Sequence, residues 1–219
     1  AAEAVLELCA ERLPKFLKTA DPLRAIQVLS PTRKGVCGVK ALNTLLQQAL
    51  NPAEKGKKEL ACGDTLFREG DKVIHIRNDY QLSWMTAAGD EGEGVFNGDM
   101  GIVLSVDPGE RELTVLFDDD RMAVYDYPLL EELELAYCLS VHKSQGSEFR
   151  AVVIPCTGGP PMLMTRNLLY TALTRARELV VLVGRESVVD QMIRNDHIAR
   201  RYTALRELLT RLNEKEPGA

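Results

Sequence analysis

The main candidate for chemistry is a polar stretch, LSVHKSQGSEF, at residues 139–149. Ser140 could cap a single helical turn, and Gly146 could end that turn in the left-handed conformation that glycine tolerates. Such a turn leaves backbone N–H groups free to bind a phosphate, and His142 and Lys143 add side-chain donors beside it. The alternative is a capped turn between strands whose polar side chains bind nothing. A generic S-x-x-K pattern favours that alternative, so the stretch needs support from elsewhere in the chain.

A second candidate is the arginine pair in LLYTALTRAR at residues 168–177. Arg175 and Arg177 fall near the C-terminal end of a predicted helix, where arginines interact favourably with the helix dipole and need no further role. The functional alternative is an arginine finger, whose planar guanidinium stabilises the charge on a γ-phosphoryl group during transfer. The residues alone leave both readings open.

The charge distribution divides the chain into three parts. Residues 69–134 carry 17 acidic and 4 basic residues, a net charge of -13, whereas residues 1–68 and 138–219 each carry +4, which together give the overall -5. Such sharp changes indicate a domain boundary on each side of the acidic middle. An acidic surface repels phosphates and gains no counterion release, so any DNA contact made by the middle must be local.

The flanking parts show the helix and strand alternation of an α/β domain with a parallel sheet. Before the acidic middle, a helix is predicted over 3–18, bent or split at Pro14, followed by a polar, lysine-rich loop at 53–63 after the next strand and helix. The predicted strands are 25–29, 137–141, 151–155 and 179–183, and the other predicted helices are 39–50, 166–177 and 193–212. Residues 1–68 and 136–219 are therefore predicted to form one α/β domain.

The middle, residues 69–135, is predicted to be an insert of a different kind. Short stretches with apolar residues at alternate positions are separated by turn signals such as Asn97-Gly98 and Pro108-Gly109, which is typical of a small barrel or sandwich. Residues 89–94 are predicted to be a loop. The stretches with this alternation are 72–77, 102–106, 113–117 and 122–125.

Composition excludes several classes of protein. No apolar run is long enough to span a bilayer and no leader is visible at the start, so we expect no membrane association and a cytoplasmic location. The five cysteines are far apart and form no C-x-x-C pair, so we predict neither a metal site nor a disulfide framework.

The two candidate stretches, taken together, resemble a known family. SVHKSQGSEF, followed about twenty residues later by LLYTALTRARELVVLVG, resembles motifs V and VI of superfamily 1 helicases. The spelling is closest to the RecD/TraA group, which moves 5′ to 3′ on DNA. The segment VLSPTRKGVCGVKALNTLLQQALNP resembles that group's motif IV, and GDKVIHIRNDY and GVFNGDMG resemble the start of its inserted SH3-like barrel. The resemblance covers nearly all of the chain from about residue 25.

This resemblance implies a fold and a set of roles. The fold would be a RecA-like (P-loop NTPase-type) parallel sheet flanked by helices and interrupted by a small all-β SH3-like barrel. Arg175 would be the motif VI finger, with Arg33 as its motif IV partner, and Gly146 and Glu148 would lie on the ATP side. The residues at the single-stranded DNA backbone would be Ser140, His142 and Lys143. In the barrel, the candidates for local DNA contact are Asn78, Asn97 and Tyr80, with Trp84 available to stack on a base.

The sequence lacks the parts that would hold the nucleotide itself. It contains no G-x-x-x-x-G-K-[ST] P-loop, and residues 113–119, which mimic a Walker B strand, are interpreted as a hairpin turn. ATP with Mg²⁺ would therefore be held by an N-terminal motor lobe, a partner of this chain alongside single-stranded DNA and a possible protein on the acidic insert. A non-catalytic DNA- or protein-binding module is the main alternative, although it would have no reason to retain Arg175 and Glu148. An RNA motor and the helicase part of a conjugative relaxase are further alternatives.

Overall fold

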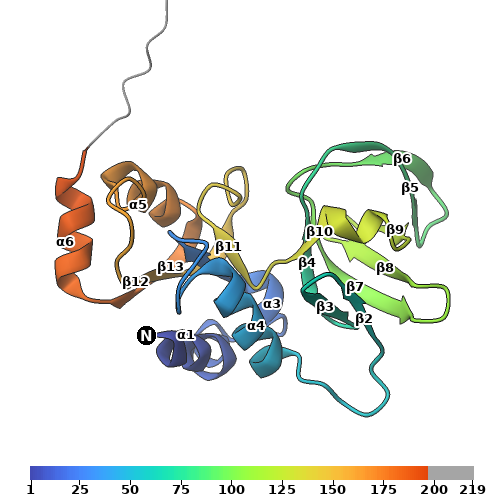
Figure 1. Ribbon diagram of the computed structural model, residues 1–219, viewed down its shortest axis with the longest axis horizontal. Helices are drawn as coiled ribbons and strands as arrows, with labels where there is room; N and C mark the ends of the chain where they lie inside the picture. Colours follow the sequence, from blue (N-terminus) through green and yellow to red (C-terminus); the bar gives the residue numbers. More distant parts are fainter. Residues whose placement is uncertain (197–219) are drawn as a thin grey trace, which may run out of the picture.

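A four-stranded parallel sheet forms the larger part of the molecule, which a computed structural model describes over residues 1–196. Strand β1 precedes the acidic insert in the chain, yet it pairs with strands that follow the insert on both of its sides (Figure 1). The two flanks of the sequence therefore build a single RecA-like sheet. In spatial order its strands are β11 (Cys138–Ser140), β1 (Ile26–Ser30), β12 (Phe149–Cys156) and β13 (Ala176–Gly184).

Helices cover both faces of this sheet, so its central strands are apolar on both sides. On one face, Val28 and Val153 pack against α4 (Val39–Leu50) and the N-terminal helices. On the other face, Leu29 and Ile154 pack against α5 (Arg166–Leu173) and α6 (Glu186–Arg194). The N-terminal helices are α1 (Ala2–Glu7), the π-helical segment Leu8–Arg12, α2 (Leu13–Leu17) and α3 (Pro22–Ala25).

The predicted break at Pro14 is absorbed within a continuous helix. Proline has no N–H, and its ring crowds the carbonyl four residues earlier, which here belongs to Ala10. Residues Leu8–Arg12 widen into a π-helix at that point, and the helix ends at Lys18 in a left-handed conformation with φ 47°. Val5, Cys9, Leu13 and Leu17 consequently stay on the buried face.

The acidic middle forms a curved antiparallel sheet, which is the barrel (Figure 1). Inward residues alternate along its strands, as with Leu113, Val115 and Phe117, and they pack around the buried Tyr125. The strands lie in the order β10 (Leu133–Leu135), β4 (Lys72–His75), β7 (Met100–Asp107), β8 (Glu112–Phe117), β9 (Arg121–Tyr125), β5 (Asp79–Thr86) and β6 (Glu91–Val95). A 3-10 helix, Leu129–Glu132, precedes β10.

Several boundaries differ from the sequence-based expectations. The loop predicted at 53–63 contains β2 (Glu59–Cys62), which pairs with β3 (Thr65–Arg68) and contributes Leu60 to the barrel core. The loop predicted at 89–94 is largely strand β6, which pairs with β5; Gly92 lies opposite Trp84 and under its ring, where an added Cβ would come within 2.5 Å. The predicted helix 166–177 ends at Leu173. The division at residues 69 and 135 stays a prediction, and most of the predicted helix 193–212 lies outside the described residues.

A buried polar network joins the barrel to the lobe. The Asp71 carboxylate accepts hydrogen bonds from Gln47 (2.6 Å), Asn51 (2.7 Å) and Tyr137 (2.9 Å), all of which lie outside the barrel strands. Beside it, the ammonium of the buried Lys72 donates to Gln27 at 2.8 Å, and burial lowers the pKa of Lys72 to about 8. These satisfied bonds fix the orientation of the insert on the sheet.

Among residues 1–196, no helix is both long and apolar enough to cross a lipid bilayer.

Candidate nucleotide and DNA site

A groove of about 930 Å³ lies at the carboxyl ends of three parallel strands. It is formed by the loops that follow β1, β11 and β12, the edge of an open α/β sheet where ligands usually bind. The groove contains all three predicted DNA-backbone residues, and it also contains Arg33, which the sequence assigned to ATP. The polar and charged residues that line it include Arg33, Lys34, Ser140, His142 and Lys143.

The turn after β11 has the predicted left-handed end but a different closure. Gly146 has φ +91°, a conformation that glycine adopts without strain. The Ser140 carbonyl, and not its hydroxyl, accepts the Lys143 N–H at 3.0 Å. The hydroxyl of the buried Ser144 donates to the Val141 carbonyl at 2.8 Å and stabilises the turn from within. These two hydrogen bonds hold the backbone of the turn, from which His142 and Lys143 line the groove.

A carboxylate that the sequence reasoning missed positions the two groove cations. Glu134, in β10, lies 2.6 Å from the Lys143 Nζ through one oxygen and 4.0 Å from the Arg33 guanidinium through the other. Arg33 remains 70% exposed, so this ion pair is solvent-screened and weak. A phosphate can therefore displace Glu134 from Arg33 at little cost, and at Lys143 it competes with a closer carboxylate contact. The only sequence signal for Glu134 is an acidic residue shortly before the cationic turn.

Arg175 is oriented but carries an uncompensated charge. Its guanidinium donates to the carbonyls of Ser147 (3.2 Å) and Thr171 (3.3 Å) and to the Thr174 hydroxyl (3.4 Å), all neutral acceptors. The side chain is half-buried. Among the residues that the structure describes, no carboxylate lies within ion-pair distance of Arg175. A fixed, unpaired guanidinium of this kind has the donor chemistry that a transferring phosphoryl group requires.

Arg175 adjoins the predicted nucleotide-side residues, as expected, because its Ser147 contact lies between Gly146 and Glu148. Arg177 differs from Arg175, since it lies in strand β13 and its Nε is 2.8 Å from the Glu148 carboxylate. Both members of that pair are exposed. The structure thus places Glu148 beside Arg177, and its role toward ATP stays a prediction.

The structure does not bring Arg33 to Arg175. Arg33 follows the last residue of β1 at the carboxyl edge of the sheet, whereas Arg175 directly precedes β13, whose first residue pairs with Phe149 at the start of β12. The length of β12 separates these two edges by roughly 20 Å. The predicted convergence of both arginines on one phosphate is therefore not formed within this lobe, and Arg33 lies instead with Ser140 and Lys143.

The barrel brings its two predicted asparagines together. The Asn78 side-chain oxygen accepts the backbone N–H of Asn97 at 3.0 Å. Beside them, the exposed rings of Tyr80 and Phe96 meet edge to face, with centroids 5.7 Å apart. Phe96 was missed by the sequence reasoning, although it lies in the same GVFNGDMG stretch. Trp84 is on a different part of the barrel, half-buried against Gly92.

Comparison with known proteins identifies the family. A family model described as the ATP-dependent RecD-like DNA helicase SH3 domain matches residues 42–117, and one described as the UvrD-like helicase C-terminal domain matches residues 135–183. The chain is 38% identical to the ATP-dependent RecD2 DNA helicase of Deinococcus radiodurans over 178 residues, 81% of this chain and 22% of that protein. The chain belongs to the RecD-like superfamily 1 helicases.

Other relatives agree with this assignment. RecD, a subunit of the RecBCD enzyme of Mycolicibacterium smegmatis, is 34% identical over 88% of this chain and 30% of its own length. The RecD-like chain thus spans less than a third of these curated relatives. Among solved structures, the Bacteroides Pif1 helicase in complex with ADP-AlF3 and single-stranded DNA matches 97% of this chain and 50% of its own, at 19% identity and a TM-score of 0.53. That likeness confirms the predicted fold, a RecA-like lobe with an SH3-like insert.

Proposed function

We propose that this RecD-like chain is the second motor lobe of an ATP-dependent 5′–3′ DNA helicase, with Arg175 as its arginine finger. The observation that carries the proposal is the state of Arg175, which is held by three neutral acceptors, half-buried and free of any carboxylate in the described part of the chain. The relatives that support it are named as ATP-dependent DNA helicase and as RecD.

In this proposal one edge of the sheet contacts ATP and the other contacts single-stranded DNA. ATP with Mg²⁺ is held by a separate N-terminal lobe, and Arg175 reaches across to the γ-phosphate and stabilises the charge of its transfer. Gly146 and Glu148 lie beside the nucleotide on the same element. At the other edge, single-stranded DNA lies in the groove, where Arg33, Lys143 and His142 contact its phosphates. The Ser140 hydroxyl lines the same groove.

A graft tests this assignment. This chain replaces the corresponding segment of the Deinococcus radiodurans relative, which it matches at 38% identity. We expect ATP hydrolysis stimulated by single-stranded DNA in the graft and negligible hydrolysis by the 219-residue chain alone, because its sequence has no P-loop. A folded graft that binds single-stranded DNA without hydrolysing ATP would support the non-catalytic binding module instead.

A further inference from the structure

A second groove, of about 1090 Å³, lies on the outer face of the barrel, apart from the lobe. The groove lies where strands β5 and β9 diverge. The registered pairs between β5 and β9 run only from Trp84 to Thr86, so the first half of β5 diverges from β9. The groove is lined by β5 residues from Asp79 to Met85, by Met122 and Val124 of β9, and by neighbours on β6 and β8. The groove is therefore elongated, because strands β5 and β9 line its two sides.

The centre of this groove is an exposed apolar strip. Met85 lies opposite Met122 in the β5–β9 register, and paired residues of antiparallel strands project to the same face. Val124 follows on that face, because alternate residues of a strand share a side. Met85 is 52% exposed and Val124 is 49% exposed. Single exposed apolar side chains are common, but adjacent ones that line a hollow are typical of interaction sites.

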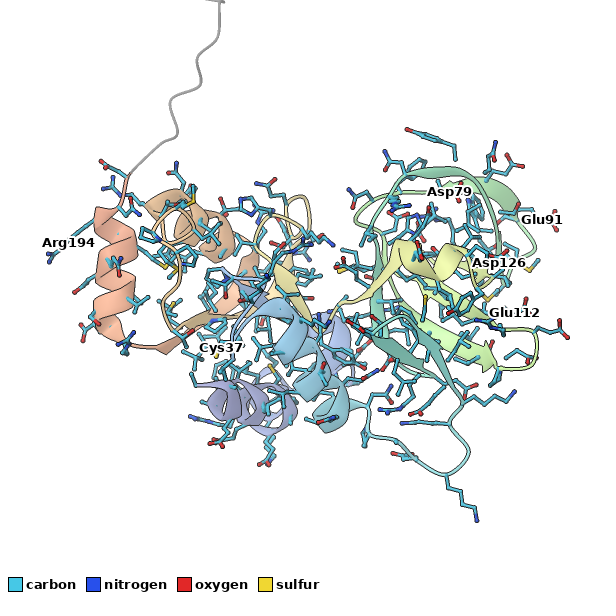
Figure 2. The ribbon with its side chains drawn as sticks, viewed as in Figure 1. Cys37, Asp79, Glu91, Glu112, Asp126 and Arg194 are labelled. Atoms are coloured by element: carbon cyan, nitrogen blue, oxygen red, sulfur yellow. The ribbon has the colours of Figure 1, made fainter. Side chains whose placement is uncertain are left out.

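The rim of the groove is acidic. Glu91 lies opposite Met85, and Glu93 opposite Ser83, so both carboxylates border the apolar strip from the edge strand β6. Asp79 lines the far end, and among the described residues of the lining none is basic. Neither Glu91 nor Glu93 forms an ion pair within residues 1–196. Figure 2 shows Asp79 and Glu91 on the barrel, together with two further acidic residues, Glu112 and Asp126.

We propose that this groove binds an extended, Lys/Arg-rich segment of a partner protein. An extended chain places alternate side chains on opposite sides, so apolar residues can pack on Met85, Met122 and Val124 while basic residues meet Glu91 and Glu93. The barrel region carries a net charge of -13, which attracts such a segment and repels nucleic acid. This interaction is independent of Arg175 and of the groove on the lobe.

The chain contains its own reporter for this site. Trp84 packs against the barrel core beside Met85 and is among the residues that line the groove. It is the single tryptophan of the sequence, so we expect its emission to change when the groove is occupied. The probe is an unlabelled octapeptide of alternating arginine and valine, titrated into the full 219-residue chain. We expect a saturable change in Trp84 emission that weakens with salt, and no change with the corresponding Glu–Val peptide.

Matched double variants localise the interaction. Glu91→Gln/Glu93→Gln is expected to weaken peptide binding about tenfold, and Met85→Ser to weaken it severalfold. The control Glu3→Gln/Glu110→Gln removes the same charge from exposed positions outside the groove and is expected to change the affinity less than twofold. Thermal unfolding verifies that each variant is folded.

Three results would overturn the proposal. Equal weakening in both double variants would mean that only total charge matters. Peptide binding detected by calorimetry without any change in Trp84 emission would place the site elsewhere. A saturable Trp84 response to oligo(dT) that the Arg–Val peptide does not displace would assign the groove to nucleic acid.

Discussion

Replacing Arg175 by lysine isolates the proposed finger from the structural role of the same side chain. Lysine keeps the positive charge but lacks the planar fork, in which one guanidinium nitrogen can hold the Ser147 carbonyl while another meets a phosphate oxygen. An arginine finger contributes about 10³-fold or more to turnover, or roughly 4 kcal/mol. We therefore expect Arg175→Lys in the graft to lower kcat for ATP about 10³-fold.

The structural contribution of Arg175 is much smaller, which makes the two roles separable. Its bonds to neutral, partly exposed acceptors at 3.2–3.4 Å contribute about 1 kcal/mol, so the variant should unfold only a few degrees lower. Steady-state ATP hydrolysis is measured at saturating single-stranded DNA, alongside DNA affinity, which should stay within twofold. Retention of more than a third of the turnover in Arg175→Lys would refute the assignment.

Arg177→Ala is the matched control for this experiment. Arg177 lies two residues away and carries the same charge, but it is paired with Glu148 on the surface. Loss of an exposed pair costs about 0–1 kcal/mol of folding stability, and the three acceptors that hold Arg175 are unchanged, so we expect kcat to fall less than fivefold. A loss in Arg177→Ala equal to that in Arg175→Lys would indicate a general disturbance of this segment.

Three further predictions concern the groove, the junction and the barrel. Lys143→Ala should weaken oligo(dT) binding and reduce the slope of log affinity against log salt concentration by about 1. Glu134→Gln should strengthen binding, because the carboxylate no longer competes with phosphate for Lys143. Fluorescence anisotropy at several salt concentrations measures both effects. Asp71→Ala should lower the free energy of unfolding by about 3 kcal/mol in urea titrations, because its buried partners lose their acceptor. Burial lowers the pKa of His75, so the unfolded chain binds more protons just below pH 6.5 and stability should fall as pH drops there, with a smaller fall in His75→Gln.

The sequence predicted most of the lobe because local signals and packing agree there. The helix at 39–50 has the predicted bounds, since its apolar stripe buries Leu42 and Leu46 and Asn51-Pro52 ends it. Helix α5 begins where predicted, with the Thr165 side chain accepting the Leu168 N–H. The end of α5 was not predicted, so Arg177, expected near the end of a helix, lies in strand β13 instead.

The barrel hairpin β5–β6 could not be predicted from local pattern. Glycines at 92 and 94, with Asp90, Glu91 and Glu93 beside them, are typical of a loop, because glycine, aspartate and glutamate are poor strand formers. What stabilises the strand is a tertiary contact, since only a residue without a Cβ fits beneath the Trp84 ring. The cross-strand partner of Gly92, Trp84, and not the local composition, therefore determines this element.

The separation of Arg33 from Arg175 has a topological cause, and it bears on how the motor is proposed to work. The chain leaves β11 at the carboxyl edge and enters β12 at the amino edge after only residues 141–148, without a connecting helix. This short crossover includes Lys143, tied to Glu134 at one edge, and Ser147, tied to Arg175 at the other. Under the proposed function, a shift of Arg175 during phosphate transfer would displace residues 141–148, which also present Lys143 to DNA. Because Lys143 and Ser147 are both held by hydrogen bonds and Gly146 lies between them, we expect the crossover to change its path at this glycine.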